Sequence, residues 1–431
     1  MMIKKYLTIL PACFVLAIFS FSNAANTKKK SFVVSNPYEH ITWETIQRHK
    51  ANLHAHTLQS DGYHKLKTVT ETYKKAGYSI LSITDHDWNW PNARLSWGLI
   101  SEEEATPYPL GKLPENFPAN TTWPWKNYGS PSPEALGMVG IEGGELTFRH
   151  HMGSYFSDYG VWYNRTGSRA PYGGIVDDTG REIFEEDQLI GIKKKGGLAI
   201  MNHPGIPSKF EWFERKSLDW YVELFKNITP DCLVGMEITN NTPETETYDE
   251  GLWDQLLARF MPGRPVWGFG NDDMHTFEIG RKGDHGGGSK NTFTVFLLDT
   301  LTQASVREAM ENGSFYFCKS SRQSNLQFND IDLFPSIQHI KVDKNRGTIT
   351  VDATNFDQVR WISSPASLQP VEDYKKSNKP WPPGRLVHDG LILNYKKTKG
   401  IKNYVRLELE RKINGHSYRT FSNPIGITVK E

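Results

Sequence analysis

Histidines and carboxylates follow short apolar segments at five separate places in this chain, and this pattern limits its possible folds more than any other feature. The five frames are residues 52–56, 83–86, 144–151, 201–204 and 270–275, and seven of the 14 histidines lie within them. Imidazoles and carboxylates that converge from separate strands are ligands that borderline divalent metals prefer. The sequence therefore predicts a fold that brings distant strand ends together around several metal ions.

A helix, a glycine, a strand and then a candidate ligand follow one another repeatedly in the first two thirds of the chain. Residues 66–76 have apolar side chains at helical spacing and end at Gly77, and the strand-like segment 78–83 then leads into Asp85 and His86. The same order recurs over residues 185–203, and further strands are expected at residues 233–239 and 265–269. Parallel strands with helical crossovers gather functional residues at their carboxyl ends. We therefore expect an α/β fold, an irregular (β/α) barrel.

The chain of 431 residues is longer than one core usually supports. From about residue 328 its character changes to short alternating segments, at residues 337–342, 348–353, 359–363, 404–410 and 425–429. We expect a barrel at residues 25–327 and a β-sandwich domain at residues 328–431. Residues 88–133, rich in Trp and Pro, and residues 155–179 are too long for ordinary loops and are candidate lids.

The first 24 residues predict an export signal. Lys4 and Lys5 precede an apolar segment at residues 6–21, and small residues allow cleavage after Ala24. The chain is then expected in the periplasm or outside the cell, with no transmembrane segment after signal removal. A formal net charge of +1 argues against nucleic acid as an obligate partner.

The first two frames and their neighbours supply several candidate ligands. His54 and His56 alternate with apolar residues, so both imidazoles leave the same face of an extended segment. Asp61, before Gly62, either bends back into the site or is a turn aspartate. His86 ends an apolar strand, and Asp85 beside it is a candidate to orient it or to act as a general acid.

The later frames leave two choices open. Glu145 ends an apolar strand and can bridge two ions, but Glu142 is its rival from spacing alone. Of the adjacent His150 and His151, one is expected to be a ligand and the other to pack or to support it.

The last two frames complete the candidate set. His203 precedes a Pro-Gly turn, and Asp273 and His275 repeat the alternation of the first pair. Asp272 is expected to accept backbone hydrogen bonds.

Together the frames resemble the PHP superfamily, the polymerase and histidinol phosphatase domain. The pattern of that superfamily appears here, in order, as His54-Ala55-His56-Thr57 with Ser60-Asp61-Gly62, Thr84-Asp85-His86, Gly143-Gly144-Glu145-Leu146-Thr147 with His150 or His151, His203-Pro204, and Asp273-Met274-His275. The match to Gly-x-Glu-Leu-Thr favours Glu145 over Glu142. Asn271-Asp272 departs from the usual Gly-Ser, and residues 88–133 have no counterpart in compact members.

The resemblance implies a distorted (β/α)7 TIM-like barrel that holds two or three divalent ions, of zinc, manganese or iron. It assigns the first ion to His54, His56, Glu145 and Asp273. It assigns the second to Glu145, His203 and either His150 or His151, and the third to Asp61, His86 and His275. The segment Ser422-Asn423-Pro424-Ile425 also resembles the closing strand of β-domains in secreted PHP-like proteins.

These residues predict a metal-dependent phosphoesterase acting on a small phosphorylated substrate. A hydroxide between two ions is expected to attack phosphorus, because ligation lowers the pKa of water from about 15.7 to about 7. Asp85, Glu145 and Asp273 are the candidate catalytic carboxylates. The candidates for holding the phosphate are Arg149, Arg281, Lys282 and Lys290.

Two alternatives stay open at this point. The first is a non-catalytic module that binds glycan or a cell-surface polymer through its aromatic insertion and β-sandwich. The second keeps the metals but cleaves an amide or another bond that contains no phosphate.

Overall fold

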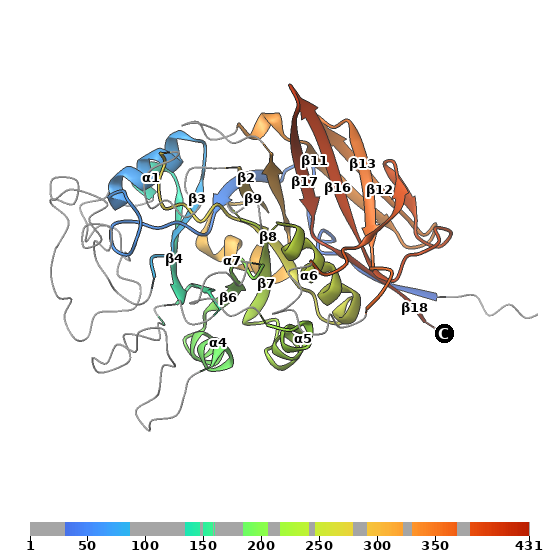
Figure 1. Ribbon diagram of the computed structural model, residues 1–431. Helices are drawn as coiled ribbons and strands as arrows, with labels where there is room; N and C mark the ends of the chain where they lie inside the picture. The colour runs from blue at the N-terminus through green and yellow to red at the C-terminus, as the bar shows by residue number, and fades with distance from the viewer. Residues whose placement is uncertain are drawn as a thin grey trace, which may run out of the picture.

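Figure 1 shows the computed structural model of the protein, which describes residues 31–86, 134–146, 150–157, 159, 184–205, 216–240, 246–278, 291–321, 330–368 and 380–430. Three predicted segments lie outside the described residues: the expected signal at residues 1–24, the first candidate lid at residues 88–133, and residues 160–179 of the second candidate lid. So do Arg149, Arg281, Lys282 and Lys290. No helix in the described part is both long and apolar enough to cross a membrane.

Seven neighbouring strands of one large mixed sheet form the region in which the predicted frames lie. They are β2 (Gln47–Asn52), β3 (Ile80–Ile83), β4 (Val139–Leu146), β5 (Met152–Tyr155), β6 (Leu198–Met201), β7 (Leu233–Thr239) and β8 (Trp267–Gly270), adjacent in that order. The pairs β2–β3, β3–β4, β6–β7 and β7–β8 are parallel, as predicted.

The strand β5 is missing from the sequence prediction, and it runs antiparallel to both β4 and β6. Only residues 147–151 separate β4 from β5, whereas a parallel crossover takes a dozen residues or more. The reversal has a functional consequence. The amino end of β5 lies at the same edge of the sheet as the carboxyl ends of its neighbours.

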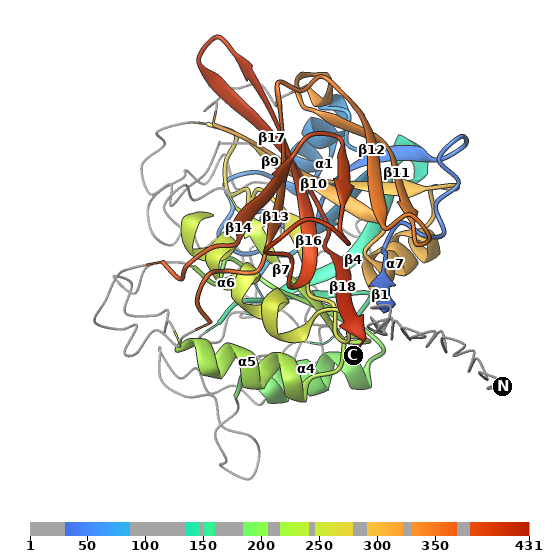
Figure 2. The same cartoon turned by 90° about the vertical axis from the view of Figure 1, so that its right-hand side faces the viewer.

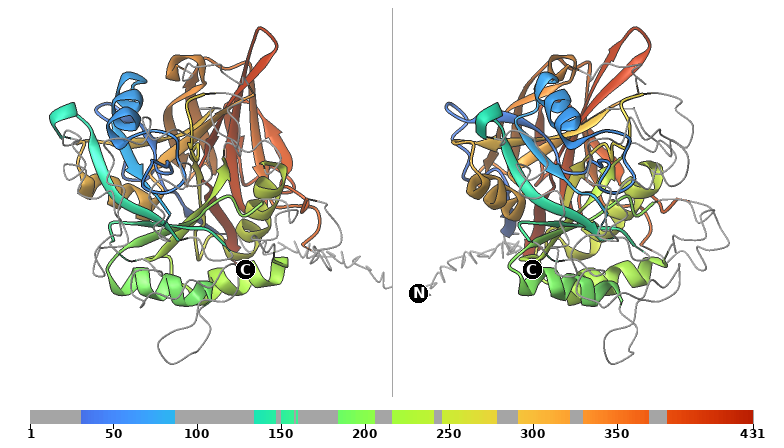
Figure 3. Two further views of the ribbon diagram at one scale, coloured as in Figure 1. Left: turned by 60° about the vertical axis from the view of Figure 1, so that its left-hand side comes forward. Right: turned by 90° about the vertical axis from the view of Figure 1, so that its left-hand side faces the viewer.

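The described helices connect strands of the large sheet and cover it (Figure 1). They are α1 (Leu66–Lys75), α4 (Glu185–Lys194), α5 (Leu218–Asn227), α6 (Glu246–Phe260) and, after β9, α7 (Gln303–Asn312). The prediction for α1 is confirmed: Leu66, Val69 and Tyr73 are buried on one face, and Gly77 follows with a left-handed φ of 81°. Both views in Figure 3 show α4 and α5 along the lower edge of the molecule.

A buried apolar cluster packs between these strands and α7. Its members include Ala51, Ile80, Ile141, Tyr155, Leu198, Val234, Phe269 and Phe296 of strands β2 to β9, together with Val306 and Met310 of α7. Side chains connect β8 to β9 (Thr292–Leu298), where Thr294 donates its hydroxyl to Gly270 O at 2.9 Å. Among the described residues no backbone ladder joins β8 to β9, so the closed (β/α)7 barrel stays a prediction.

The large sheet continues without a break into the C-terminal part. β9 pairs with β2, and the path runs on through β10 (Phe315–Ser320), β17 (His416–Ser422), β16 (Asn403–Ile413), β18 (Ile425–Lys430) and β1 (Ser31–Ser35), with β13 (Gln358–Ser363) and β14 (Arg385–Asp389) beside β16. Figure 2 shows β1 beside β18, and Ser31 is in register with Lys430.

A second sheet contains β11 (Ser336–Asp343), β12 (Thr348–Thr354) and β15 (Ile392–Asn394). Two short 3-10 helices, η2 (Glu134–Leu136) and η3 (Ile331–Leu333), complete the described elements. Ile340 and Val351 of this sheet share one apolar cluster with Trp361 and Leu407 of the large sheet. The predicted short strands are therefore present in two packed sheets, but one of these sheets also belongs to the first region. A separate β-sandwich domain with a boundary at residue 328 stays a prediction.

Candidate metal centre

The candidate ligands predicted from the sequence, except His150, meet at one rim of the large sheet. We call this set the rim cluster: His54, His56, Asp61, His86, Glu145, His151, His203, Asp273 and His275. His54, His86, His203 and Asp273 follow the carboxyl ends of β2, β3, β6 and β8. His151 instead precedes β5, and the antiparallel direction of β5 brings it to the same rim.

The first group of ligand atoms contains His54, His56, Glu145 and Asp273, all within 4.8 Å of one another. Asp273 Oδ1 lies 3.1 Å from the Nε2 atoms of both His54 and His56. Glu145 Oε1 lies 3.2 Å from His54 Nε2, and its Oε2 lies 3.3 Å from His56 Nε2. This is the set that the resemblance assigned to the first ion.

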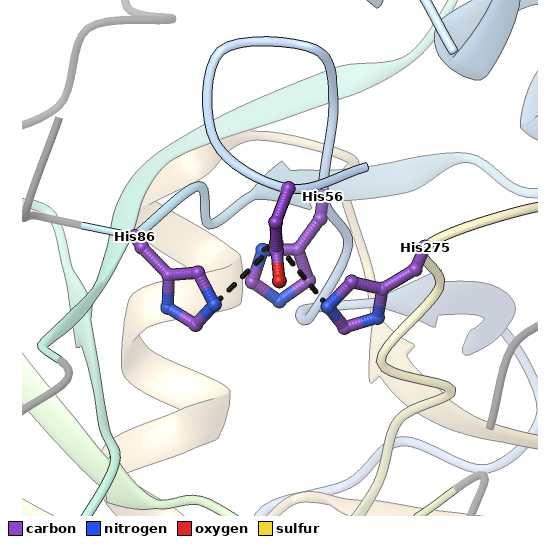
Figure 4. Close-up of side chains that lie close together, drawn as sticks. His56, His86 and His275 are labelled. Atoms are coloured by element: carbon purple, nitrogen blue, oxygen red, sulfur yellow. Dashed lines mark ion pairs between the residues drawn. The ribbon is translucent and has the colours of Figure 1, made fainter. Parts of the chain in front are cut away.

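The second group surrounds Asp61. Its Oδ1 lies 3.3 Å from His275 Nε2, 3.4 Å from His86 Nε2 and 3.6 Å from His56 Nδ1. Figure 4 shows the three imidazoles turned toward one carboxylate. The resemblance assigned Asp61, His86 and His275 to the third ion, and the structure adds His56 to them.

The third group is centred on Glu145. His151 Nδ1 lies 3.0 Å and His203 Nε2 lies 3.1 Å from the same oxygen, Oε1. His86 Nδ1 lies 3.1 Å from Oε2. The group with mutually close ligand atoms is His86, Glu145 and His151, whereas the resemblance placed His203, not His86, in the second ion's set.

The two open choices have a clear geometric outcome. His150 faces away from the rim cluster, with its Nε2 2.9 Å from the hydroxyl of Tyr221 and its Nδ1 3.4 Å from Glu185 Oε1. Glu142 belongs to none of the three groups, while Glu145 belongs to two. Of each pair, it is His151 and Glu145 that lie where an ion could be held.

Burial and charge act against each other throughout this cluster. Burial alone raises the pKa of Asp61, Glu145 and Asp273, but the surrounding imidazoles outweigh it and lower the pKa of each carboxyl. Burial alone lowers the pKa of His54, but Asp273 and Glu145 raise that pKa well above its usual value. The carboxylates therefore stay ionised and require cations beside them.

The donor set fits divalent metal ions. Imidazole nitrogens and carboxylate oxygens are the ligands of zinc, manganese and iron sites. His54 Nε2 and His56 Nε2 lie 3.2 Å apart, so both rings direct a nitrogen at one small volume that Glu145 and Asp273 also face. These clusters could hold metal ions, and the ligand roles of the individual residues stay predictions.

Glu237, in β7, is a functional candidate that the sequence interpretation missed. It is fully buried, and its Oε1 lies 2.9 Å from His54 Nδ1 and accepts a hydrogen bond from Asn271. Its Oε2 accepts from the backbone N–H of His203 at 2.9 Å. A carboxylate that holds the far nitrogen of a ligand imidazole fixes the tautomer and the ring orientation. The signal was a glutamate inside an apolar strand segment, residues 233–239.

Asp85 braces the loop between His56 and Asp61. Its Oδ1 accepts from Thr57 N and Ser60 Oγ, and its Oδ2 accepts from Thr57 Oγ1, each at 2.7 Å. Ser60 Oγ in turn lies 3.3 Å from His56 Nδ1. Asp85 thus holds the ligand-bearing loop and, among the described contacts, has both oxygens engaged.

Asp272 accepts side-chain hydrogen bonds from residues that are distant in sequence. Both Asn52 and Tyr73, on β2 and α1, donate to its Oδ1 at 2.7 Å. The backbone hydrogen bonds expected for Asp272 stay a prediction.

The rim cluster contains two non-glycine residues in the left-handed region, His203 with a φ of 24° and Asp273 with a φ of 46°. Such backbone is uncommon for these residue types and gathers at functional sites. Gly62 permits a close approach nearby, since a Cβ there would lie 2.6 Å from the carbonyl carbon of His56.

No family model matches the sequence, and no curated protein matches it significantly. Three similar solved structures illustrate what the fold resembles. A two-domain protein containing a predicted PHP-like metal-dependent phosphoesterase, from Bacteroides vulgatus ATCC 8482, is 15% identical with a TM-score of 0.43, over 86% of this chain and 91% of that one. A candidate metal-dependent phosphoesterase from Bifidobacterium adolescentis ATCC 15703 is 15% identical with a TM-score of 0.32, over 61% and 96%.

An amidohydrolase from Chromobacterium violaceum is 12% identical with a TM-score of 0.30, over 52% of this chain and 87% of that one. The PHP superfamily, which the sequence frames resemble, is thus represented among the structural neighbours. At TM-scores this low, the function of the chain has to be argued from its own residues.

Proposed function

We propose that the protein is a metal-dependent hydrolase, and specifically a phosphoesterase that acts on a small phosphorylated substrate after export from the cytoplasm. One observation carries the proposal. Three groups of ligand atoms share members: Glu145 belongs to two of them, and so do His56 and His86. Shared ligands place candidate ion sites next to one another, as phosphoester hydrolysis by adjacent metals requires.

The chain's own residues have distinct tasks in this proposal. Glu145 directs Oε1 at His54, His151 and His203 and Oε2 at His56 and His86, so it links neighbouring sites. Bound ions would activate a water molecule and neutralise phosphoryl oxygens. Asp85 is assigned to holding the loop of Asp61 rather than to proton transfer, because its oxygens are engaged there.

The test is hydrolysis of an aryl phosphate by the full chain loaded with zinc, manganese or iron(II). We expect Glu145→Gln to reduce kcat/KM by at least roughly 100-fold, the loss typical when one electrostatic group is removed from an active site. His54→Ala should also lose activity, while His416→Ala, on an exposed strand end, should keep it. Equal activity of His54→Ala and the unmodified chain would contradict the enzyme proposal.

The identity of the cleaved bond needs a separate measurement. Inorganic phosphate should inhibit a phosphoesterase clearly and an amidase weakly. A panel of phosphorylated metabolites would then give the leaving group. Metal binding in the expected stoichiometry with no hydrolysis of any ester or amide would instead favour the binding module.

A further inference from the structure

A buried tyrosine connects the two loops that supply His151 and His203. The hydroxyl of Tyr221 donates to Pro204 O at 3.3 Å and lies 2.9 Å from His150 Nε2. The second contact is a hydrogen bond whose direction depends on the tautomer of His150, whose other ring nitrogen faces Glu185. His150 and Tyr221 are both fully buried.

Each end of this connection lies one residue from the rim cluster. His150 is adjacent to His151, and Pro204 is adjacent to His203. The imidazoles of His151 and His203 converge on the same atom, Glu145 Oε1, at 3.0 and 3.1 Å. The Tyr221 hydroxyl therefore contacts the sequence neighbours of both imidazoles that face this oxygen.

Tyr221 is itself firmly held. It lies in α5, whose first turn is capped by Ser217 Oγ accepting from Trp220 N at 3.3 Å. Its ring packs edge-on against Trp220 at 5.0 Å and Trp381 at 5.8 Å between centroids. A rigid helix thus supports the hydroxyl, and the aromatic packing would survive removal of the oxygen alone.

The backbone of His203 explains why such support is needed. Its φ of 24° is a left-handed conformation, which is unfavourable for a residue other than glycine and persists only when the surroundings impose it. Its N–H donates to Glu237, and the next carbonyl accepts from Tyr221. The strained residue is held by a hydrogen bond on each side.

We propose that Tyr221 is a positioning residue for an ion bound at Glu145 Oε1, on which His151 and His203 converge, and that it acts through those two histidines. The inference rests on the proposed metal-dependent function. It predicts that removal of one hydroxyl outside the rim cluster weakens one metal site and leaves the others unchanged.

The experiment is a stepwise titration of the metal-free full chain with zinc alone, by calorimetry and elemental analysis. Tyr221→Phe should weaken one binding step by roughly 10- to 100-fold, the usual cost of losing an outer support of a metal ligand. Anomalous diffraction at limiting zinc should assign the lost occupancy to the position between Glu145, His151 and His203. Tyr395→Phe is the matched control, because Tyr395 is buried and the described structure gives its hydroxyl no hydrogen-bond partner.

The outcomes separate this inference from the proposed function. If the unmodified chain binds no zinc, and no manganese or iron(II) in the same titration, the proposed function is wrong and this inference with it. If it binds several ions and Tyr221→Phe matches it at every step, the positioning role is wrong. A uniform weakening of all steps, with a lower unfolding midpoint than Tyr395→Phe, also overturns it, because that result indicates a general structural role.

Discussion

Two buried charged clusters in this molecule, the rim cluster and a second one, differ in how their charges are balanced. We call the second the arginine cluster; in it Arg406 of β16 forms ion pairs with Asp254 of α6 and with Glu408 of β16. Arg406 donates to both oxygens of Asp254, at 2.9 and 2.8 Å, and also to Glu408. Tyr404 and the backbone N–H of Gly384 complete the shell of Asp254, each at 2.6 Å.

The arginine cluster contains its own permanent cation, whereas the three carboxylates of the rim cluster form ion pairs with imidazoles within the described residues. A guanidinium stays charged at any ordinary pH, but an imidazole can exchange its proton for a metal ion. The comparison teaches that a buried charge is not by itself a functional signal. The informative feature is a set of carboxylates whose neighbouring cations are exchangeable.

The largest expected effect comes from breaking the arginine cluster. Arg406→Met should lower the free energy of unfolding by about 3–5 kcal/mol, because Asp254 and Glu408 would stay buried without their cation. Urea unfolding measures this change. Arg346→Ala, at a side chain that is 83% exposed, is the control and should cost less than about 1 kcal/mol. A similar small loss for Arg406→Met would show that the cluster does not hold the two regions together.

Metal removal should affect only the rim cluster. Each ion at a hundredfold excess over its Kd adds about 2.7 kcal/mol to the stability of the native state. Addition of a chelator should therefore lower the thermal midpoint of both the unmodified chain and Arg406→Met. The shift should shrink in Glu145→Gln, since that residue serves two of the ligand groups. No response of the unmodified chain to chelation would contradict the metal assignment.

Glu237→Gln should weaken metal binding by roughly 10- to 100-fold while the chain stays folded. The amide keeps the size of the side chain, but its nitrogen would oppose one of the donors that the carboxylate now accepts from. Zinc titration monitors the change, with Glu223→Gln on the exposed face of α5 as a control. An unchanged affinity would remove Glu237 from the functional set.

The contribution to stability should depend on pH differently for the rim cluster and for the arginine cluster. Carboxylates raise the pKa of His54 in the metal-free chain, so its contribution to stability is present at low pH and is lost as pH rises through that pKa. Metal binding displaces the same proton, so zinc affinity should rise about tenfold per pH unit for each proton released.

The arginine cluster should respond in the opposite direction. Burial raises the pKa of Glu408, but Arg406 and its neighbours outweigh it and lower the pKa to about 2. Its contribution is therefore present above the ordinary range of a glutamate and is lost as pH falls toward 2. The free energy of unfolding of the metal-free chain, measured at acidic and at neutral-to-alkaline pH, would separate the contributions of the two clusters. If stability showed one common pH dependence, that result would argue against separate clusters.

The sequence predicted strands and helices best in the segments where a periodic apolar pattern is followed by candidate ligands. The segments 198–201 and 233–239 coincide with β6 and β7, and α1 and α4 lie where the helical spacing placed them. β5 was missed because Met152-Gly153-Ser154-Tyr155 contains no β-branched residue. It was tertiary pairing with β4 and β6 that made this segment a strand.

The choices left open by the sequence share one physical cause. Adjacent residues of an extended segment point in opposite directions, and so do residues three apart. The sequence therefore shows that only one of His150 and His151, or of Glu142 and Glu145, can face the rim. Which one does so depends on strand direction and sheet curvature, and these arise from distant contacts. Glu237 was missed for a related reason, since its partner His54 lies 183 positions away.

The pairing of β1 with β18 has a mechanical consequence. Because the strands are antiparallel and Ser31 faces Lys430, both ends of the described chain leave from the same end of one ladder. A force applied between them would load these hydrogen bonds one after another, like a zipper, instead of all at once. Under tension the molecule should open first at the β1–β18 pair, while the strands that carry the candidate ligands remain folded.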